Sequence, residues 1–253
     1  MGVSRTKLEN YLNELLQPWA WNDYCPNGLQ VEGCDEIGRI VTGVTATQAL
    51  IDAAIERQAH AILVHHGYFW KGEDAAIRGM KRQRLAKLLA HDINLFAYHL
   101  PLDVHDRFGN NVQLAARLGI KVQRRLEPWN KQSVAMKGKL TDPISVDEMA
   151  ERIEVQLGRA PLVIAGGDHP IRSVAWCTGG GQHYIDAAAA QGIDAFISGE
   201  VSEQTVHVAR EMGVHFFAAG HHATERYGAM ALGEHLQEHF GLDVEFVDID
   251  NPV

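Results

Sequence analysis

We expect the sequence to fold as an α/β protein made of two related α/β domains, with a metal site in the cleft between them. Short apolar runs alternate with amphipathic segments, which is typical of a mainly parallel sheet with helices on its faces. Part of this order recurs later in the chain. Histidine and acidic residues gather after the predicted strands, where ligands bind in open α/β sheets.

The composition indicates a globular protein with a real core, since 46% of the 253 residues are hydrophobic and 22% are charged. The net charge of −9 argues against a general binder of nucleic-acid backbones, although it does not exclude a locally basic groove. We find neither an apolar run that spans a membrane nor a signal peptide. Three cysteines without C-x-x-C spacing fit a reducing compartment, so we expect a cytoplasmic protein.

The first half of the chain predicts helices and strands in alternation. Leucines and Tyr11 recur at helical spacing up to Leu16, and Pro18 stops the helix. The stretch 26–30, Pro-Asn-Gly-Leu-Gln, is a turn signature. We expect helices over 4–16, 47–58, 80–91 and 110–118, and strands over 39–44, 61–64 and 93–98.

Two polar clusters end strands in this half. Val64-His65-His66-Gly67 closes the second strand, and the glycine lets the chain turn so that both imidazoles reach one crevice. The third strand continues into His99-Leu100-Pro101-Leu102-Asp103. His65, His66 and Asp103 are therefore candidate metal ligands.

The second half begins after a stretch, 121–143, without clear periodicity. We place the domain boundary near 128, so that the first domain is 1–128 and the second is 129–242. The C-terminal strand, 243–253, can join the first domain. Ser145-Val146-Asp147-Glu148 is a capping box that starts a helix ending at Gly158.

An ordered series of matches relates the two halves. The series predicts an internal repeat, because four matches in the same order are harder to produce by chance than one. The matching segments are 39–41 with 172–174, 51–54 with 185–188, 64–66 with 198–200, and 96–97 with 217–218.

The repeat of the last strand, 214–219, leads into Gly220-His221-His222-Ala223-Thr224-Glu225. If a helix begins after Gly220, His221 and Glu225 share one face, a turn apart. Mixed nitrogen and oxygen ligation suits Zn, Fe, Mn, Co or Ni. Three histidines and two carboxylates exceed the needs of one catalytic zinc, so we expect two divalent transition metal ions per chain. Such a pair, about 3.5–4 Å apart, activates water for hydrolysis.

Taken together, the motifs at 26–30, 64–67, 99–103, 198–200 and 220–225 resemble those of the Nif-three-like family, whose members are also named GTP cyclohydrolase I type 2 homologues. The resemblance covers nearly the whole chain. It implies a two-domain protomer, a dinuclear metal site and a toroidal homohexamer. It also implies that His65, Asp103 and Glu225 bind one metal, and that His66 and His221 bind the other with Glu225 bridging. His222 stands where the family usually has Tyr.

Other polar residues have weaker signals. His99 and Glu200 are candidate catalytic residues for proton transfer. The alternative role for these two residues, and for His105, is to orient a metal ligand or to contact the substrate. Gly179-Gly180-Gly181 has the place of a phosphate loop but neither the lysine nor the spacing, so close packing explains it better. His235 and His239, one turn apart on the last helix, are interpreted as part of a solvated face.

Two classes of function remain open at this point. The first is a metal-dependent hydrolase of a small nucleotide-like or cyclic amide-type substrate. The alternative is a ring-shaped metal-binding scaffold, or a protein that binds nucleic acid or another partner without catalysis. In a third interpretation the histidines are merely structural, and the purified protein would carry no metal.

Overall fold

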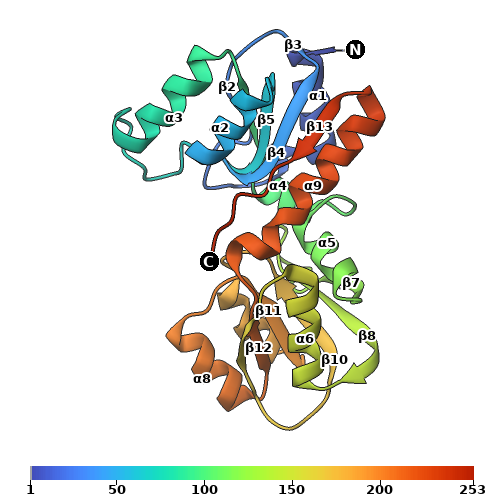
Figure 1. Ribbon diagram of the computed structural model, residues 1–253. Helices are drawn as coiled ribbons and strands as arrows, with labels where there is room; N and C mark the ends of the chain where they lie inside the picture. The colour runs from blue at the N-terminus through green and yellow to red at the C-terminus, as the bar shows by residue number, and fades with distance from the viewer. Residues whose placement is uncertain (1) are drawn as a thin grey trace. The chain divides into compact units, whose positions relative to one another are not determined.

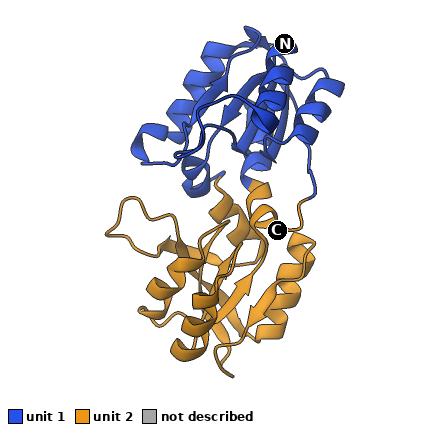
Figure 2. Ribbon diagram, turned by 90° about the vertical axis from the view of Figure 1, so that its left-hand side faces the viewer, with its two compact units in different colours: residues 1–108, 228–250 blue, residues 109–227, 251–253 orange. Residues whose placement is uncertain are grey.

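The computed structural model describes residues 2–253, and these residues divide into two compact units (Figure 2). Unit 1 contains the chain up to Phe108 together with Gly228–Asp250, and unit 2 contains Gly109–Tyr227 and Asn251–Val253. Both units combine a sheet with helices (Figure 1), which confirms the predicted α/β class. No helix within residues 2–253 has both the length and the apolar composition that crossing a membrane requires.

Unit 1 is built on a five-stranded sheet in the order β13-β4-β5-β6-β2. Four neighbouring strands run parallel, and β2 pairs antiparallel with β6 at the edge. The strands are β2 (Gly28–Val31), β4 (Arg39–Thr45), β5 (Ala61–His66), β6 (Asn94–Ala97) and β13 (Asp243–Phe246), with a separate pair of β1 (Val3–Ser4) and β3 (Glu36–Ile37). The helices are α1 (Arg5–Leu16), α2 (Gln48–Glu56), α3 (Gly79–Ala90) and α4 (Leu100–Val104), with a 3-10 turn η1 (Pro18–Ala20).

Both faces of this sheet are buried, which explains the near-continuous apolar runs in its strands. Along β5, Leu63 belongs to the core shared with α1, while Ile62 and Val64 belong to the core shared with α2 and α3. This alternation follows from the strand period of two residues. The two histidines therefore end a strand that is covered on both faces.

Unit 2 has a six-stranded sheet in the order β7-β8-β10-β11-β12-β9. Its three central parallel strands are flanked by antiparallel ones on both sides. The strands are β7 (Lys121–Arg125), β8 (Met136–Ile144), β9 (Leu162–Ile164), β10 (Ile171–Cys177), β11 (Ala195–Ser198) and β12 (His215–Ala218). The helices are α5 (Asn110–Arg117), α6 (Val146–Leu157), α7 (Ile185–Ala189) and α8 (Glu203–Met212), with η2 (Gln182–Tyr184), and α9 (His221–Phe240) contains the boundary between the units.

The two sheets share one connectivity. The order β4-α2-β5-α3-β6 in unit 1 matches β10-α7-β11-α8-β12 in unit 2, and each last strand has an antiparallel neighbour at the edge. This agrees with the predicted internal repeat. The capping box at Ser145 is also present, with Ser145 and Glu148 exchanging hydrogen bonds.

The structure differs from the prediction in four places. Residues 121–143 form most of the β7–β8 pair rather than irregular chain, and Gly28 in the predicted turn begins β2. The boundary between the units lies at 108/109 rather than near 128, because α5 packs Leu114 and Ala115 into the core of unit 2. The second half of α9, from Gly228, belongs to unit 1.

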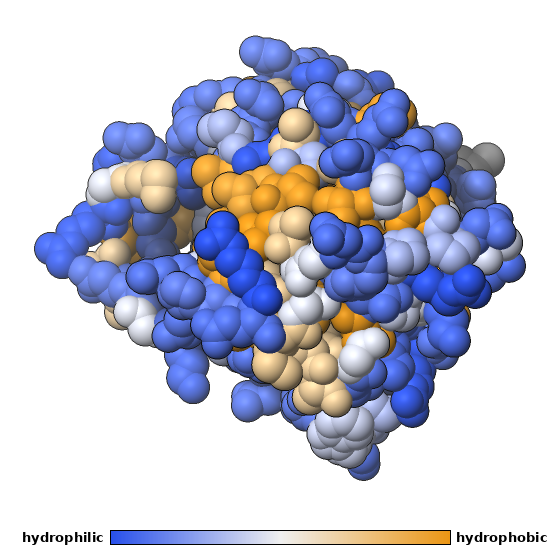
Figure 3. Space-filling model, turned by 90° about the horizontal axis from the view of Figure 1, so that it is seen from below, coloured by the Kyte–Doolittle hydropathy of each residue, from blue (hydrophilic) through white to orange (hydrophobic). Residues whose placement is uncertain are grey.

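The two edges of the unit 2 sheet differ in character. At one edge, Leu162 and Val163 of β9 are 52% and 38% exposed. At the other edge, β7 is rich in lysine and arginine. Figure 3 shows one face of the molecule, on which hydrophobic residues gather in a central area bordered by hydrophilic side chains.

A buried histidine links β12 to the loop before β10. His215 is fully buried, its Nδ1 accepts the Gly166 N–H at 3.2 Å, and its Nε2 lies 2.9 Å from the His169 carbonyl oxygen, to which it donates in one tautomer. Burial lowers the pKa of His215, and the neighbouring His169 adds to this effect although the hydrogen bond to its carbonyl opposes it. At a pH just below 6.5 this ring is therefore neutral in the folded protein but protonated in the unfolded chain.

We predict that His215 makes the protein less stable in acid. Because its folded pKa is lowered, its contribution is present above the unfolded pKa and is lost as the pH falls through the folded pKa. Urea unfolding at about pH 7.5 and about pH 5.5 should show a smaller loss of stability for His215→Gln than for the wild type. His207→Gln, on the exposed side of α8, is the control and should retain the wild-type loss. An unchanged pH dependence in His215→Gln would contradict the assignment.

Candidate metal centre

In unit 1, His65 is fully buried at the end of β5. Its Nδ1 donates to the Tyr98 carbonyl oxygen at 3.0 Å, which fixes the tautomer and leaves the Nε2 lone pair for a ligand bond. Nε2 lies 3.5 Å from Oδ1 of Asp103, a buried carboxylate on α4. Strand pairing thus places the first predicted imidazole beside the first predicted carboxylate.

His66 is half-buried and also has its Nδ1 engaged, by the Thr45 hydroxyl at 3.2 Å. The two neighbouring rings have centroids 4.5 Å apart, so both turn to the same side, as the sequence predicts. The turn depends on Gly67, where a Cβ would lie 2.1 Å from Gln30 Oε1 and 2.6 Å from Ala97 Cβ. Each of these distances is too short for a side chain.

His99 completes a cluster of three imidazoles in unit 1. One nitrogen from each of His65, His66 and His99 lies within 4.8 Å of the others. His99 Nδ1 donates to Oδ1 of Asp23 at 2.7 Å, and Asn27 Oδ1 accepts the His99 backbone N–H at 2.6 Å. Asp23 and Asn27 therefore orient His99, which extends the predicted site toward the loop before β2.

Asp23 also belongs to this cluster, although no motif in the sequence points to it. Its carboxylate is only 3% exposed, and although burial raises its pKa, hydrogen bonds from His99, Asn27 and the Tyr24 backbone bring the pKa below its usual value. The group is therefore ionised next to the His99 ring. Cys25 also lies within ligand distance of Asp23 and His99, but burial and the charge of Asp23 raise its pKa to about 12. A protonated thiol is a poor metal ligand.

In unit 2, His221 is the first residue of α9 and lies between two carboxylates. Its Nδ1 donates to Glu200 Oε1 at 2.7 Å, and its Nε2 lies 3.1 Å from Oε2 of the buried Glu225, one helical turn on. Burial alone would lower the pKa of His221, but these two carboxylates raise it to about 9. A metal that binds Nε2 must therefore displace a proton from a strongly basic imidazole.

Gly179 packs directly against this pair. With φ at +62°, a Cβ on Gly179 would lie 2.0 Å from Glu225 Oε1 and 2.9 Å from His221 Nε2. Its N–H donates to Thr224 Oγ1 at 3.0 Å, and its carbonyl accepts the Ser198 hydroxyl at 3.1 Å. The glycine loop thus packs against the predicted ligand side chains, which agrees with the close packing predicted for it.

Glu200, a predicted proton-transfer residue, has an orienting position. One carboxylate oxygen accepts from His221, and the other lies 3.4 Å from Nε2 of Gln182. His105 lies apart from both clusters: its Nδ1 accepts the backbone N–H groups of Arg107 and Phe108. We therefore assign His105 to the turn after α4, and not to a ligand shell. The backbone N–H of His222 donates to the Val253 carbonyl oxygen at 3.0 Å.

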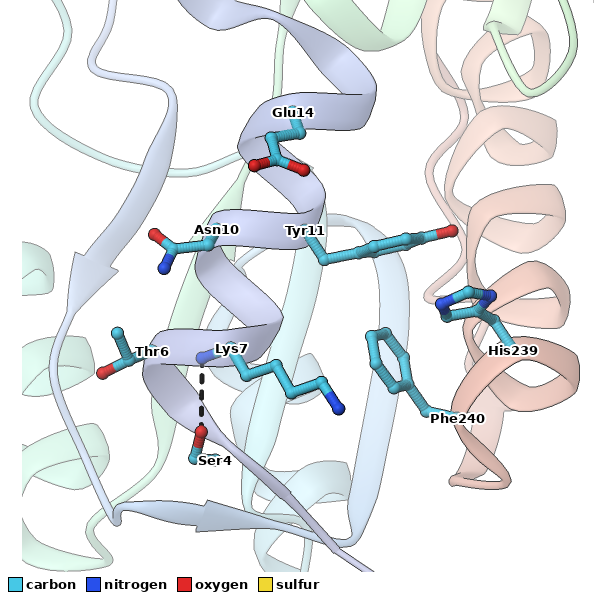
Figure 4. A pocket seen from close by; sticks show the side chains of 8 residues that line it. All are labelled: Ser4, Thr6, Lys7, Asn10, Tyr11, Glu14, His239 and Phe240. Atoms are coloured by element: carbon cyan, nitrogen blue, oxygen red, sulfur yellow. Dashed lines mark hydrogen bonds between the residues drawn. The ribbon is translucent and has the colours of Figure 1, made fainter.

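A groove of about 550 Å³ lies along α1 in unit 1 (Figure 4) and contains none of the predicted metal ligands. One of its walls is aromatic, with His239 stacked on Tyr11 at a centroid distance of 4.4 Å. His235 bonds to the Tyr11 hydroxyl and stacks on Phe108. The interpretation of His235 and His239 as a solvated face is therefore wrong for His235. The groove is lined by Ser4, Thr6, Lys7, Asn10, Tyr11, Glu14, His239 and Phe240.

Comparison with known proteins now places the chain in a family. The model of the family described as Duf34/NIF3 (NGG1p interacting factor 3) matches residues 3–252. The chain belongs to the Duf34/NIF3 family. Among its curated relatives, a protein of Vibrio cholerae is 60% identical over 253 residues, covering 99% of this chain and 100% of the relative. One of Escherichia coli is 57% identical with the same coverage. Both are named "GTP cyclohydrolase 1 type 2 homolog".

Solved structures of similar proteins share this fold. The structure of protein ybgI matches with a TM-score of 0.95 and 57% identity, covering 99% of this chain and 100% of that one. TTHA1606 from Thermus thermophilus matches with a TM-score of 0.90 and 32% identity over the same shares. The family membership confirms the resemblance seen in the sequence motifs.

We predict that Gly179→Ala weakens metal binding much more than a strain-matched control. The added methyl group displaces Glu225 and His221, whereas Gly192→Ala introduces the same kind of left-handed strain (φ +63°) into open space. Each variant should lose about 1–2 kcal/mol of stability from backbone strain. In titrations of metal-free protein with Zn²⁺ or Mn²⁺, only Gly179→Ala should lose affinity, by about tenfold or more. Equal affinities for the two variants would refute this role of Gly179.

Proposed function

We propose that the protein is a metal-dependent hydrolase with two divalent transition metal ions per chain. In this proposal His65, Asp103 and Glu225 bind one ion, and His66 and His221 bind the other with Glu225 shared. The predicted ligands of each unit already lie together within that unit, which supports the assignment.

One observation carries the proposal. All three imidazoles assigned as ligands are hydrogen-bonded through Nδ1, to Tyr98, Thr45 and Glu200 respectively. Imidazoles that bind metals usually have the second ring nitrogen engaged in this way, which orients the ring and raises its basicity. Three oriented imidazole nitrogens together with two carboxylates fit Zn, Fe, Mn, Co or Ni.

The substrate we propose is small and nucleotide-like or of the cyclic amide type. The name of the close relatives, GTP cyclohydrolase 1 type 2 homolog, supports this class. Trp70 adds a physical reason, since its ring lies 5.0 Å from that of His99 and 5.9 Å from that of His66. An indole beside the site offers a surface on which a flat heterocycle stacks.

When bound, a pair of metal ions supplies an activated water and a polarised substrate carbon. The chain's own groups then divide the remaining work. The Asp23 carboxylate holds the Nδ1 proton of His99, which leaves His99 Nε2 to accept or donate a proton at the substrate. Glu200 holds His221 in place for the metal and so has a positioning role.

The metal assignment is tested first by His66→Ala. We expect this variant to lose bound metal, measured by elemental analysis against about two ions per wild-type chain. It should also lose hydrolysis across a panel of nucleotides and cyclic amides assayed with the same metal restored. His207→Ala, an exposed histidine of α8, should retain both. Turnover by a His66→Ala protein free of metal would refute the proposal.

The role of His99 is tested through Asp23. Asp23→Asn keeps a similar shape but removes the charge that orients His99, so metal content should stay unchanged while kcat falls by about a hundredfold. Asp103→Asn, in contrast, should lose metal and activity together. If Asp23→Asn loses metal as Asp103→Asn does, then His99 is a ligand and its assigned role is wrong.

A further inference from the structure

The β7–β8 pair forms a basic hairpin in a chain whose net charge is −9. Within residues 121–139 only Glu127 is acidic, and its carboxylate accepts a hydrogen bond from Ser133 at 3.1 Å. The basic residues in this segment are Lys121, Arg124, Arg125, Lys131, Lys137 and Lys139. The segment is therefore strongly positive against an acidic background.

Four of these cations lie on one face of the hairpin in two directly opposed pairs. Lys121 is the partner of Lys139, and Arg124 is the partner of Lys137, on the same side two residues along β8. Within residues 2–253, no carboxylate forms an ion pair with any of the four. Burial and the charges of Arg124 and Lys139 lower the pKa of Lys137.

Such an arrangement works against folding. Like charges directly opposite each other in an antiparallel pair are destabilising. The lysine and arginine side chains at 121, 124 and 139 are exposed, so an anion in solution has access to them. A bound polyanion would replace the repulsion by attraction, since each phosphate would neutralise a cation that the fold leaves without a counter-charge.

The tip of the hairpin presents an aromatic ring. Trp129 is 71% exposed, in a loop that two turns hold in shape: Asn130 N–H donates to Glu127 O, and Ser133 N–H donates to Asn130 O. Arg125 reinforces the loop by donating to the Lys131 carbonyl oxygen at 3.0 Å. An exposed indole on an ordered loop next to a row of cations offers a surface on which an unpaired base stacks.

Within unit 2 the hairpin is connected to the segment that carries the candidate site. Asn111 donates to the Val134 carbonyl oxygen at 3.2 Å and accepts the Thr178 N–H at 3.1 Å. Thr178 precedes Gly179, which packs against Glu225. The register of β8 with β10 also places Met136 opposite Trp176, so the loop with Trp129 lies at the carboxyl end of β10.

We propose that the β7–β8 hairpin binds single-stranded nucleic acid, with its paired cations on the phosphates and Trp129 stacked on a base. The partner is single-stranded because bases in a duplex are already stacked on each other and are not available to an indole. This binding site is independent of the proposed hydrolysis and of bound metal.

Fluorescence anisotropy with a labelled 12-nucleotide oligothymidylate and the full-length protein tests the proposal. Lys121→Gln/Arg124→Gln should weaken binding about tenfold or more at about 50 mM salt. It should also reduce the slope of log K against log salt by about 1.4, which is two phosphate contacts at about 0.7 each. The control Arg82→Gln/Arg210→Gln removes the same charge from exposed positions on α3 and α8 and should bind like the wild type.

Trp129→Ala tests the stacking separately. It should weaken binding at least about fivefold without changing the salt slope, because the indole carries no charge. Thermal melting excludes misfolding, since Lys121→Gln/Arg124→Gln relieves repulsion and should melt at or above the wild-type temperature. Equal loss in the control double variant overturns the proposal. A second pair of results would also overturn it: inorganic polyphosphate displaces the labelled oligonucleotide as well as unlabelled oligonucleotide does, and Trp129→Ala does not weaken binding.

Discussion

The candidate centre depends on the hydrogen bond from His65 Nδ1 to the Tyr98 carbonyl oxygen. Parallel pairing of β5 with β6 sets this bond, because Val64 faces Ala97 in register and the Val64 carbonyl accepts the Tyr98 N–H at 3.0 Å. The carbonyl of Tyr98, the residue directly after β6, therefore lies beside the His65 ring. Because the imidazole is fully buried, its tautomer is set by the hydrogen bond to the backbone carbonyl and not by water. The ring nitrogen directed at Asp103 is thus determined by backbone geometry.

In unit 2 the imidazole of His221 is also oriented through Nδ1, but by a side chain instead of a backbone carbonyl. Here the imidazole lies at the start of a helix, and two glycines allow the helix to approach the strand ends. A Cβ on Gly199 would lie 2.7 Å from the His221 α-carbon, and one on Gly179 would overlap Glu225. The Glu200 carboxylate on Nδ1 of His221 then does what the backbone carbonyl does for His65, while Glu225 lies at Nε2. The internal repeat thus conserves the strand order but not the chemistry at the strand ends.

The parallel strands and the candidate metal-binding motifs could be found in the sequence because both have local signals. Apolar runs mark β4, β5 and β6. Each metal-binding candidate motif is also short: His65 and His66 are adjacent, and His221 and Glu225 are four residues apart. Asp23 had no such signal, since it meets His99 only through the folded chain. The β7–β8 pair was missed for another reason. Lys121–Arg125 has no alternation of polar and apolar residues, because the strand lies at a sheet edge with most of its residues exposed.

The candidate metal centre and the basic hairpin share one physical feature. In each, ionisable groups lie close together: buried carboxylates and imidazoles in one, opposed cations in the other. Burying charge and opposing like charges both cost stability, and local inconsistencies of this kind concentrate at functional sites. The missing counter-charge then indicates the ligand. Clustered carboxylates and imidazoles favour a cation as ligand. The opposed lysine and arginine side chains of the hairpin, which have no carboxylate partner among residues 2–253, favour a polyanion, so the charge of each cluster separates the two proposed sites.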